Sequence, residues 1–464
     1  MRKPIKVAIA GLLLGGLALA APAHAAATTG IDVKPDERHQ TIDGFGYATA
    51  FGRTKLVYNL PAEKQQQLLD LLLSRSGASP SILRLGISSG SNSILATDPG
   101  SPTATAKYTW DAWDDGQLWF SKEAKKRGVK NFYANAWSAP GYMKDNGSEA
   151  NGGQLCGLQG VECADGEDWR EAYAKYLVQY AKFYKGEGIK IGHLGFVNEP
   201  DYHPSYSSME VSPAQAAEFL KILGPKAKEA GVKLTCCESF GWDQGKPFAD
   251  AIRADKDALK QLSVFTGHSY ASRSDNKLAI TNKKKTWMSE WAPSSTEDGW
   301  NEAWDSGKVS DAINVAESIQ DTLAEADASA YLYWYGVSSG GTAALIQVDP
   351  ATQDYKISKR YYVFAAYSRF IQPGAERIGV SSDASGVKVS AYLNADGSTV
   401  VQLLNLGNST VKTSVDLGKT TTGYLTDSTH SLEATDTVFG NRNAKRSNLV
   451  LPARSLVTLV QPKS

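Results

Sequence analysis

Two glutamates each stand at the end of an apolar stretch of β-strand length. Glu199 follows one such stretch and precedes Pro200, and Glu290 closes the stretch that begins at Thr286. Cleavage of a glycosidic bond requires a carboxylic acid that protonates the leaving oxygen and a carboxylate that meets the oxocarbenium-like carbon. If the two groups lie about 5–5.5 Å apart, the carboxylate attacks as a nucleophile and the anomeric configuration is retained. These positions therefore predict a carboxylate pair for glycoside hydrolysis.

Four other polar residues accompany this pair. Asn198 precedes the first glutamate and can hydrogen-bond a sugar 2-hydroxyl in the transition state. Arg84 lies inside a predicted strand, where an unpaired charge is costly, so we expect it to pair with Glu290 or to form an ordinary interior salt bridge. His268 is either a donor to a carboxylate or sugar hydroxyl or a core histidine, and Glu238 is expected to be structural or substrate-positioning.

Aromatic residues gather just after the predicted strand ends. The chain contains 11 Trp and 21 Tyr, which suit either a large aromatic core or flat surfaces that stack on sugar rings. We expect four of them to line a sugar site: Trp137, Tyr202, Tyr270 and Trp334.

The elements that must position these residues alternate between strands and helices. Residues 44–371 contain eight apolar runs of strand length, mostly separated by amphipathic helical stretches. This alternation predicts an α/β fold, a (β/α)8 TIM barrel, in which reactive side chains sit at the C-terminal ends of the strands. Glu199 then ends the fourth strand and Glu290 the seventh, so the carboxylates face each other across the barrel mouth. The pattern is weakest between residues 270 and 286, where no helix is evident.

A second domain follows the barrel. Residues 372–464 change to a two-residue alternation of apolar and polar side chains, typical of a β-sandwich. Residues 26–43 contain a strand with no helix of its own, which we expect to join this sandwich.

The N-terminus has the features of a secretory signal peptide. Basic residues precede an apolar run over residues 7–20, and Ala23-His24-Ala25 fits a cleavage site, so we expect residues 1–25 to be removed on export. The run is too short for a membrane anchor. The 49 basic and 49 acidic residues cancel, which disfavours a nucleic-acid or anionic-membrane partner.

Four cysteines are present, an even number in an oxidising compartment. Cys156 and Cys163 could close a glycine-rich loop as a disulfide. Cys236 and Cys237 are adjacent and either form a vicinal disulfide or stay as buried thiols. No accompanying spacing indicates a zinc site.

The chain resembles glycoside hydrolase family 30, and within it the fungal-type xylanases of subfamily 7, over nearly its whole length after the signal peptide. The stretches that carry this resemblance are Ala134–Lys144 (ANAWSAPGYMK), Asn151–Gly157 (NGGQLCG), His193–Tyr202 (HLGFVNEPDY), Ser205–Met209 (SYSSM), Thr235–Cys237 (TCC) and Ala330–Trp334 (AYLYW).

The resemblance implies a retaining mechanism with Glu199 as acid/base and Glu290 as nucleophile, a barrel fused to a side β-sandwich, and xylan as substrate. It also implies that Arg53, after the first strand, pairs with the carboxylate of a methylglucuronate side chain, since a guanidinium suits such a group. This chain has Ala48-Thr49-Ala50-Phe51-Gly52-Arg53 where subfamily members usually carry Ser-Glu-Ala-Phe-Gln-Arg.

We therefore expect a secreted, monomeric, endo-acting β-1,4-xylanase that prefers glucuronoxylan and needs no metal or organic cofactor. Three alternatives remain: release of xylobiose from chain ends, another family 30 activity such as β-1,6-galactanase, and non-catalytic xylan binding.

Overall fold

The computed structural model describes residues 30–88, 95–163, 166–281, 284–293, 300–341, 343–443 and 445–463. The predicted signal peptide, residues 1–25, lies outside these ranges. Among the described helices, none combines the length and the apolar character that crossing a bilayer demands.

Eight parallel strands close into a barrel, and the predicted (β/α)8 fold is confirmed. The strands pair in chain order, and the barrel closes where the last strand pairs with the first. They are β2 (Gly44–Ala48), β3 (Ile82–Ile87), β6 (Asn131–Ala136), β7 (Ile191–Gly195), β8 (Lys233–Ser239), β9 (Leu262–His268), β10 (Lys285–Trp291) and β11 (Ala330–Tyr335).

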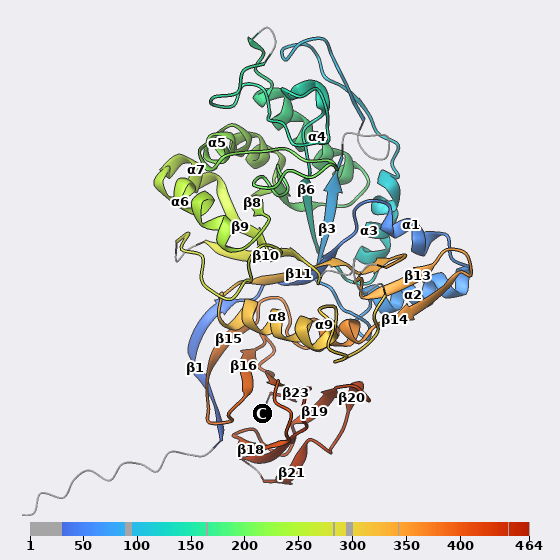
Figure 1. Ribbon diagram of the computed structural model, residues 1–464, viewed down its shortest axis with the longest axis vertical. Helices are drawn as coiled ribbons and strands as arrows, with labels where there is room; N and C mark the ends of the chain where they lie inside the picture. Colours follow the sequence, from blue (N-terminus) through green and yellow to red (C-terminus); the bar gives the residue numbers. More distant parts are fainter. Residues whose placement is uncertain are drawn as a thin grey trace, which may run out of the picture.

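Helices surround this barrel (Figure 1). They are α1 (Arg53–Tyr58), α2 (Ala62–Leu73), α3 (Gln117–Lys126), α4 (Arg170–Gly186), α5 (Pro213–Ala230), α6 (Lys246–Ala254), α7 (Lys256–Gln261), α8 (Ala312–Ala324) and α9 (Lys359–Ser368). The start and the end of helix α5 follow from its capping residues. The Ser212 hydroxyl and the Gln215 side chain cap its start reciprocally, and Gly231 ends it with a φ of 71°. As the sequence indicates, the described residues between β9 and β10 contain no helix.

The fourth barrel strand is shorter than the apolar run over residues 191–199 predicts. Strand β7 ends at Gly195, and the chain then turns so that Glu199 adopts a left-handed φ of 49°. The Glu199 N–H donates to the carbonyl of Glu238 on the neighbouring strand, at 2.9 Å. Glu238 also has a positive φ, 58°. Both glutamates are therefore held in backbone conformations that are uncommon for side-chain-bearing residues.

Two small sheets in the loops were not predicted, because their strands are only two to four residues long. Strands β4 (Leu95–Thr97) and β5 (Lys107–Thr109) form an antiparallel pair. Strands β12 (Val337–Ser338), β13 (Ile346–Asp349) and β14 (Asp354–Ile357) form a second sheet between β11 and α9.

Ten further strands form the side β-sandwich around a hydrophobic core of its own. Figure 1 shows β1, in blue, running beside β15 at the lower side of the molecule. In spatial order the strands are β20 (Ser431–Ala434), β19 (Thr422–Thr426), β23 (Ser455–Gln461), β17 (Thr399–Asn405), β16 (Val387–Leu393), β15 (Glu376–Ser382), β1 (Ile31–Thr41), β18 (Val411–Val415), β22 (Ser447–Leu451) and β21 (Phe439–Arg442).

Ion pairs fasten the sandwich to the barrel. Lys388 on β16 pairs with Glu317 and Asp321 on α8, at 3.0 and 2.6 Å. Arg454 forms a two-pronged pair with Asp305, at 2.6 and 2.8 Å. These contacts favour a fixed orientation of the two domains.

The barrel closure suggests a first test, at Asp43. Its carboxylate accepts from Lys285 at 2.5 Å and from the indole N–H of the fully buried Trp287 at 2.9 Å. Asp43→Ala leaves that indole without a partner, so the free energy of unfolding falls by about 1–3 kcal/mol in urea titrations. Asp43→Asn keeps a side-chain oxygen that accepts from the indole, so its free energy of unfolding should fall less than that of Asp43→Ala. Equal stability of the two variants would show that the indole hydrogen bond does not matter.

Candidate active site

A cavity of about 440 Å³ lies at the C-terminal ends of the barrel strands and is lined by both predicted glutamates, Glu199 and Glu290. Most of its other lining residues are aromatic. The full lining is Phe51, Arg53, Trp137, Asn198, Glu199, Tyr202, Tyr206, Phe240, Tyr270, Glu290, Trp334 and Tyr335.

The two carboxyl groups lie close together. Glu199 and Glu290 each present an oxygen, and these oxygens lie within 4.8 Å of one another and of a ring nitrogen of His268. Both glutamates are at least 95% buried. This closeness is nearer to the carboxyl separation of retaining glycosidases, about 5–5.5 Å, than to that of inverting enzymes, about 6.5–9.5 Å.

Arg84, on β3, is buried next to the cavity and contacts several of the site residues. Its guanidinium forms an ion pair with Glu290, as the sequence suggested, and donates at 2.6 Å to both Glu238 and Asn198. Burial alone would lower the pKa of Arg84, but the charges of Glu238 and Glu290 outweigh it and raise the pKa. The side chain is 0% exposed, so it orients the carboxylates and does not line the cavity.

His268, at the end of β9, bridges two carboxyl groups. Its Nδ1 lies 3.1 Å from Glu199 and its Nε2 lies 2.9 Å from Glu238. Burial would lower its pKa, but the charge of Glu290 and the hydrogen bonds to Glu199 and Glu238 raise the pKa to about 10. The ring is therefore an imidazolium at neutral pH and donates from both nitrogens. It too is 0% exposed and lies beneath the cavity.

Glu238, on β8, is the centre of this buried network. Besides Arg84 and His268, it accepts a hydrogen bond from Tyr133 on β6 at 2.7 Å. Burial would raise its pKa, but Arg84 and His268 overcome that effect and lower the pKa well below the usual glutamate range. Glu238 is thus a permanent anion and a positioning group, one of the two roles that the sequence left open.

Tyrosine hydroxyls complete the contacts of the two cavity glutamates. Tyr270 donates to Glu290 at 2.9 Å, and Tyr206 donates to Glu199 at 2.7 Å. Burial and the nearby carboxylates raise the pKa of both phenols, so they stay protonated donors.

The charges of the cluster fix its proton count. Arg84 and the protonated His268 supply two positive charges, and Glu238, Glu290 and Glu199 are three potential negative charges. Because uncompensated charge is costly in a buried site, the neutral arrangement has one proton on the Glu199–Glu290 pair. Burial raises the pKa of Glu290 above the usual glutamate range, and the charges of His268 and Arg84 oppose this effect only in part. A shared proton is the starting condition for an acid working beside a carboxylate.

Two groups of aromatic side chains line the cavity. In the first, Trp137 lies 5.9 Å from Trp334 and 5.1 Å from Phe51, measured between ring centroids. In the second, Tyr202 stacks on Phe240 at 4.3 Å with rings 7° from parallel. Such faces suit the apolar C–H surfaces of sugar rings.

Arg53 begins α1 at the edge of the cavity. Its guanidinium carbon lies 4.9 Å from the centroid of the Tyr335 ring. Its Nε is buried without a hydrogen-bond partner, and no carboxylate in the described part of the chain forms an ion pair with it. The group is therefore available to an anion that enters the cavity.

Four lining residues lie outside the set expected from the sequence: Phe51, Tyr206, Phe240 and Tyr335. Tyr206 lies within a stretch that carries the family resemblance and Tyr335 directly follows another, which is the signal that could have singled them out. Phe51 lies two residues before Arg53, after the first barrel strand. Phe240 follows Glu238 by two residues at the end of β8, a position typical of barrel active sites.

Glu199, His268 and Glu290 also form a group with the geometry to hold a metal ion. A cation there would displace Arg84 from Glu290 and meet the positive charge of His268. The donor set therefore favours a sugar site with an internal arginine over a metal centre.

Comparisons with known proteins agree with this geometry. Residues 42–350 match the family model described as Glycosyl hydrolase family 59, and residues 374–459 match the Glycosyl hydrolase family 30 beta sandwich domain. The solved catalytic domain of GH30 xylanase C from Talaromyces cellulolyticus is 39% identical, with a TM-score of 0.86, over 93% of this chain and 99% of that one. The chain belongs to glycoside hydrolase family 30. The family 59 model matches the barrel residues alone. The match of the sandwich to the family 30 domain and the nearly full-length similarity to the family 30 xylanase assign the chain to family 30.

Curated relatives of this family 30 chain differ in their substrates. Glucuronoxylanase XynC of Bacillus subtilis is 26% identical over 284 residues, 59% of this chain and 61% of that protein. The match thus spans about three fifths of the length of that relative. An endo-1,6-beta-D-glucanase of Neurospora crassa is 25% identical over 395 residues, 79% of this chain and 78% of that protein.

The pKa of His268 predicts how its contribution to stability depends on pH. The folded pKa of about 10 exceeds the ordinary 6.5, so the stabilisation is complete below about pH 6.5 and is lost as pH rises through 10. In urea titrations the free energy of unfolding of the wild type should exceed that of His268→Gln most near pH 6. This difference should shrink toward pH 10.

His193 on β7 is a matched control, since burial lowers its pKa to about 4 and it is neutral across this range. His193→Gln should differ from the wild type by a constant amount between about pH 7.5 and 10, above the pKa of 6.5 that its imidazole has in the unfolded chain. A margin for His268→Gln that is equally constant would mean that His268 is not an imidazolium.

Proposed function

We propose that this family 30 hydrolase cleaves β-1,4-xylosidic bonds of glucuronoxylan with retention of configuration, acting within the chain. The observation that carries the proposal is the Glu199–Glu290 pair, whose carboxyl oxygens lie within 4.8 Å of each other in one aromatic-lined cavity. The short separation supports a covalent intermediate over direct attack by water.

In the proposed first step Glu290 is the nucleophile. One of its oxygens forms a bond to the anomeric carbon while the bond from that carbon to the leaving oxygen breaks. Glu199 gives its proton to that oxygen, so the shortened chain leaves as an alcohol. In the second step Glu199 takes a proton from water, the water oxygen bonds to the anomeric carbon, and Glu290 is released.

The contacts of the two glutamates support this division of roles. Glu290 faces the guanidinium of Arg84 directly and has His268 at 3.7 Å, contacts that favour a carboxylate. Glu199 instead accepts hydrogen bonds from Tyr206 and from His268. The direct ion pair with Arg84 therefore supports Glu290 as the nucleophile and leaves Glu199 as the acid. Asn198, held by Arg84, faces the cavity where a sugar 2-hydroxyl would lie.

Xylan is favoured as the substrate by the 39% identical relative, which is named a xylanase. The glucuronoxylanase relative and the guanidinium of Arg53, which forms no ion pair with the described carboxylates, favour a uronate-bearing xylan. The glucanase relative makes β-1,6-glucan the second candidate, and release of xylobiose from chain ends is the second mode of attack. Export is proposed from the signal-peptide pattern, and it fits the two cysteine pairs at disulfide-bonding distance, Cys156–Cys163 and Cys236–Cys237.

The test is a timed digestion of glucuronoxylan, unsubstituted linear xylan and β-1,6-glucan, with products resolved by mass. We expect long uronate-bearing fragments early from glucuronoxylan, slower action on linear xylan, and none on the glucan. Arg53→Leu removes a charged two-pronged contact, so kcat/KM on glucuronoxylan should fall about 10–100-fold while linear xylan is affected little.

Arg75→Leu, at an exposed position outside the cavity, is the matched control for this change. Xylobiose as the first product of both xylans would replace the endo-acting assignment by chain-end attack. Equal loss on both xylans in Arg53→Leu would rule out uronate recognition by Arg53.

A further inference from the structure

Lys144 is a buried lysine in the loop between β6 and α4, outside the cavity lining. It follows the short turn of helix η2 (Gly141–Met143) and is 4% exposed. Its ammonium donates to the backbone carbonyl of Gly152 and, at 2.7 Å, to the carbonyl of Ser208. These two carbonyls belong to two different loops, so the ammonium ties the loops together.

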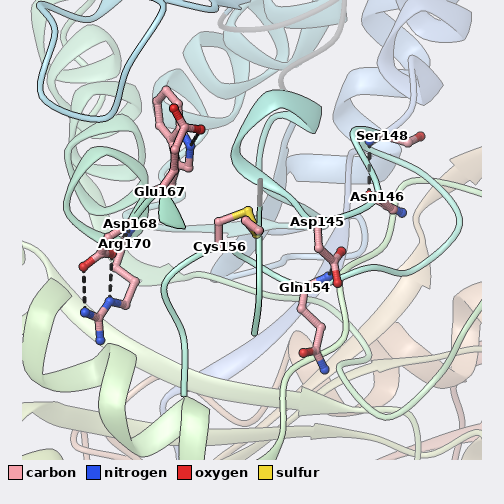
Figure 2. Close-up of a disulfide and its surroundings, with 10 residues drawn as sticks. Asp145, Asn146, Ser148, Gln154, Cys156, Glu167, Asp168 and Arg170 are labelled. Carbon is pink, nitrogen blue, oxygen red and sulfur yellow. Dashed lines mark hydrogen bonds and ion pairs between the residues drawn. A yellow bond between two sulfur atoms is a disulfide. The ribbon is translucent and has the colours of Figure 1, made fainter. Parts of the chain in front are cut away.

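The first of these loops is itself closed at its base. Lys144 and Leu155 form an antiparallel bridge, and Cys156 pairs with Cys163 just beyond it. Figure 2 shows Asp145, Gln154 and Cys156 on adjoining segments of this loop. The Gln154 N–H donates to the Asp145 carboxylate at 2.7 Å, which adds to the closure. The loop is therefore a fixed support on which Lys144 can act.

The second loop lies between β7 and α5 and lies along the first. The backbone N–H of Asn151 donates to the carbonyl of Tyr206, and that of Ser208 donates to the carbonyl of Glu149, at 3.3 and 3.0 Å. The Ser208 hydroxyl accepts from the Gly152 N–H and donates to the Tyr206 carbonyl, each at 2.9 Å. Lys144 adds an ammonium to these contacts between the two loops, beside the carboxylate of Glu149, which accepts from the Ser207 hydroxyl at 3.3 Å.

Tyr206 lies next to the stretch of the second loop that Lys144 binds, and it lines the active-site cavity. Its hydroxyl donates to Glu199 at 2.7 Å, yet 47% of the residue is exposed. A half-exposed ring is not held in place by burial, so the position of its hydroxyl depends on the backbone that carries it. That backbone is the stretch tied to Lys144.

We propose that Lys144 is a positioning residue for acid/base catalysis: by binding the carbonyls of Gly152 and Ser208 it fixes the loop that holds the Tyr206 hydroxyl on Glu199. The inference rests on the proposed role of Glu199. An ammonium suits the task because it offers three donors to carbonyl oxygens, and a hydrogen bond is stronger in the protein interior than in water.

The charged neighbours of Lys144 allow its ammonium form under assay conditions. Burial lowers its pKa to about 8, against the charges of Asp145, Glu149 and Glu210, which raise it. His203 faces Glu210 at 3.1 Å on the second loop. Measurements at pH 6 therefore compare variants with a protonated Lys144.

The experiment compares two substrates that differ in their need for an acid. Unactivated xylo-oligosaccharides need Glu199 to protonate the leaving oxygen, whereas a dinitrophenyl β-xylobioside has a leaving group that departs without a proton. Lys144→Met should lower kcat/KM about 10-fold or more on xylotetraose and change it less than about 3-fold on the dinitrophenyl xylobioside. A merely structural loss would lower both equally.

A double-mutant cycle tests the route through Tyr206. If Lys144 acts by placing that hydroxyl, Lys144→Met should cost little further activity in a Tyr206→Phe background. Ser208→Ala removes the hydroxyl contacts between the same two loops and is a smaller change. If Lys144→Met does not fold, Ser208→Ala should show the same difference between the two substrates. Lys125→Met is the matched control, since Lys125 also donates to a backbone carbonyl, that of Gly188 at 2.8 Å, but on the outer surface.

The outcomes separate the two proposals. An equal loss on both substrates, or full additivity with Tyr206→Phe, overturns the role of Lys144 while leaving the proposed function intact. A wild-type protein that hydrolyses neither xyloside overturns the proposed function itself.

Discussion

A buried guanidinium is the constraint on which this active site depends. Arg84 is a barrel-strand residue that is 0% exposed. The free-energy cost of removing its charge from water must be offset by carboxylates and further hydrogen bonds around it. The structure meets that demand with Glu238, Glu290 and Asn198. His268 joins as a second cation between Glu199 and Glu238. Two cations and three carboxyls then leave one proton for the pair that faces the cavity.

The barrel makes this arrangement possible because the residues of the buried cluster come from different strands. Arg84 comes from β3, Glu238 from β8, His268 from β9 and Glu290 from β10, and Glu199 follows β7. The strands alone do not suffice, since Glu199 and Glu238 require left-handed backbone conformations. Such strain persists only where surrounding contacts hold it, and the hydrogen bond from the Glu199 N–H to the Glu238 carbonyl is one of them.

The sequence predicted the parts of this account that depend on periodicity and strand ends. The barrel, the helix over residues 213–230 and the glutamates after the fourth and at the seventh strand follow from local pattern. The pairing of Arg84 with Glu290 was one of two expectations, and it came from the cost of an unpaired buried charge. The early end of β7 was missed because an apolar run does not reveal a turn into a positive φ. Tyr206 was not selected because its place depends on two loops joined by Lys144, a long-range contact without a periodic signal. His268 stayed open between two roles, since its charge arises from carboxylates distant in sequence.

The central claim is that Glu290 is the nucleophile of a retaining enzyme, and trapping the covalent intermediate tests it most directly. The protein is incubated with a 2-deoxy-2-fluoro-β-xylobioside that carries a good leaving group, and its peptides are then analysed by mass spectrometry. The account predicts one fluorosugar per chain, attached to Glu290. A label on Glu199 or Glu238, or turnover of xylan to products of inverted configuration, would contradict it.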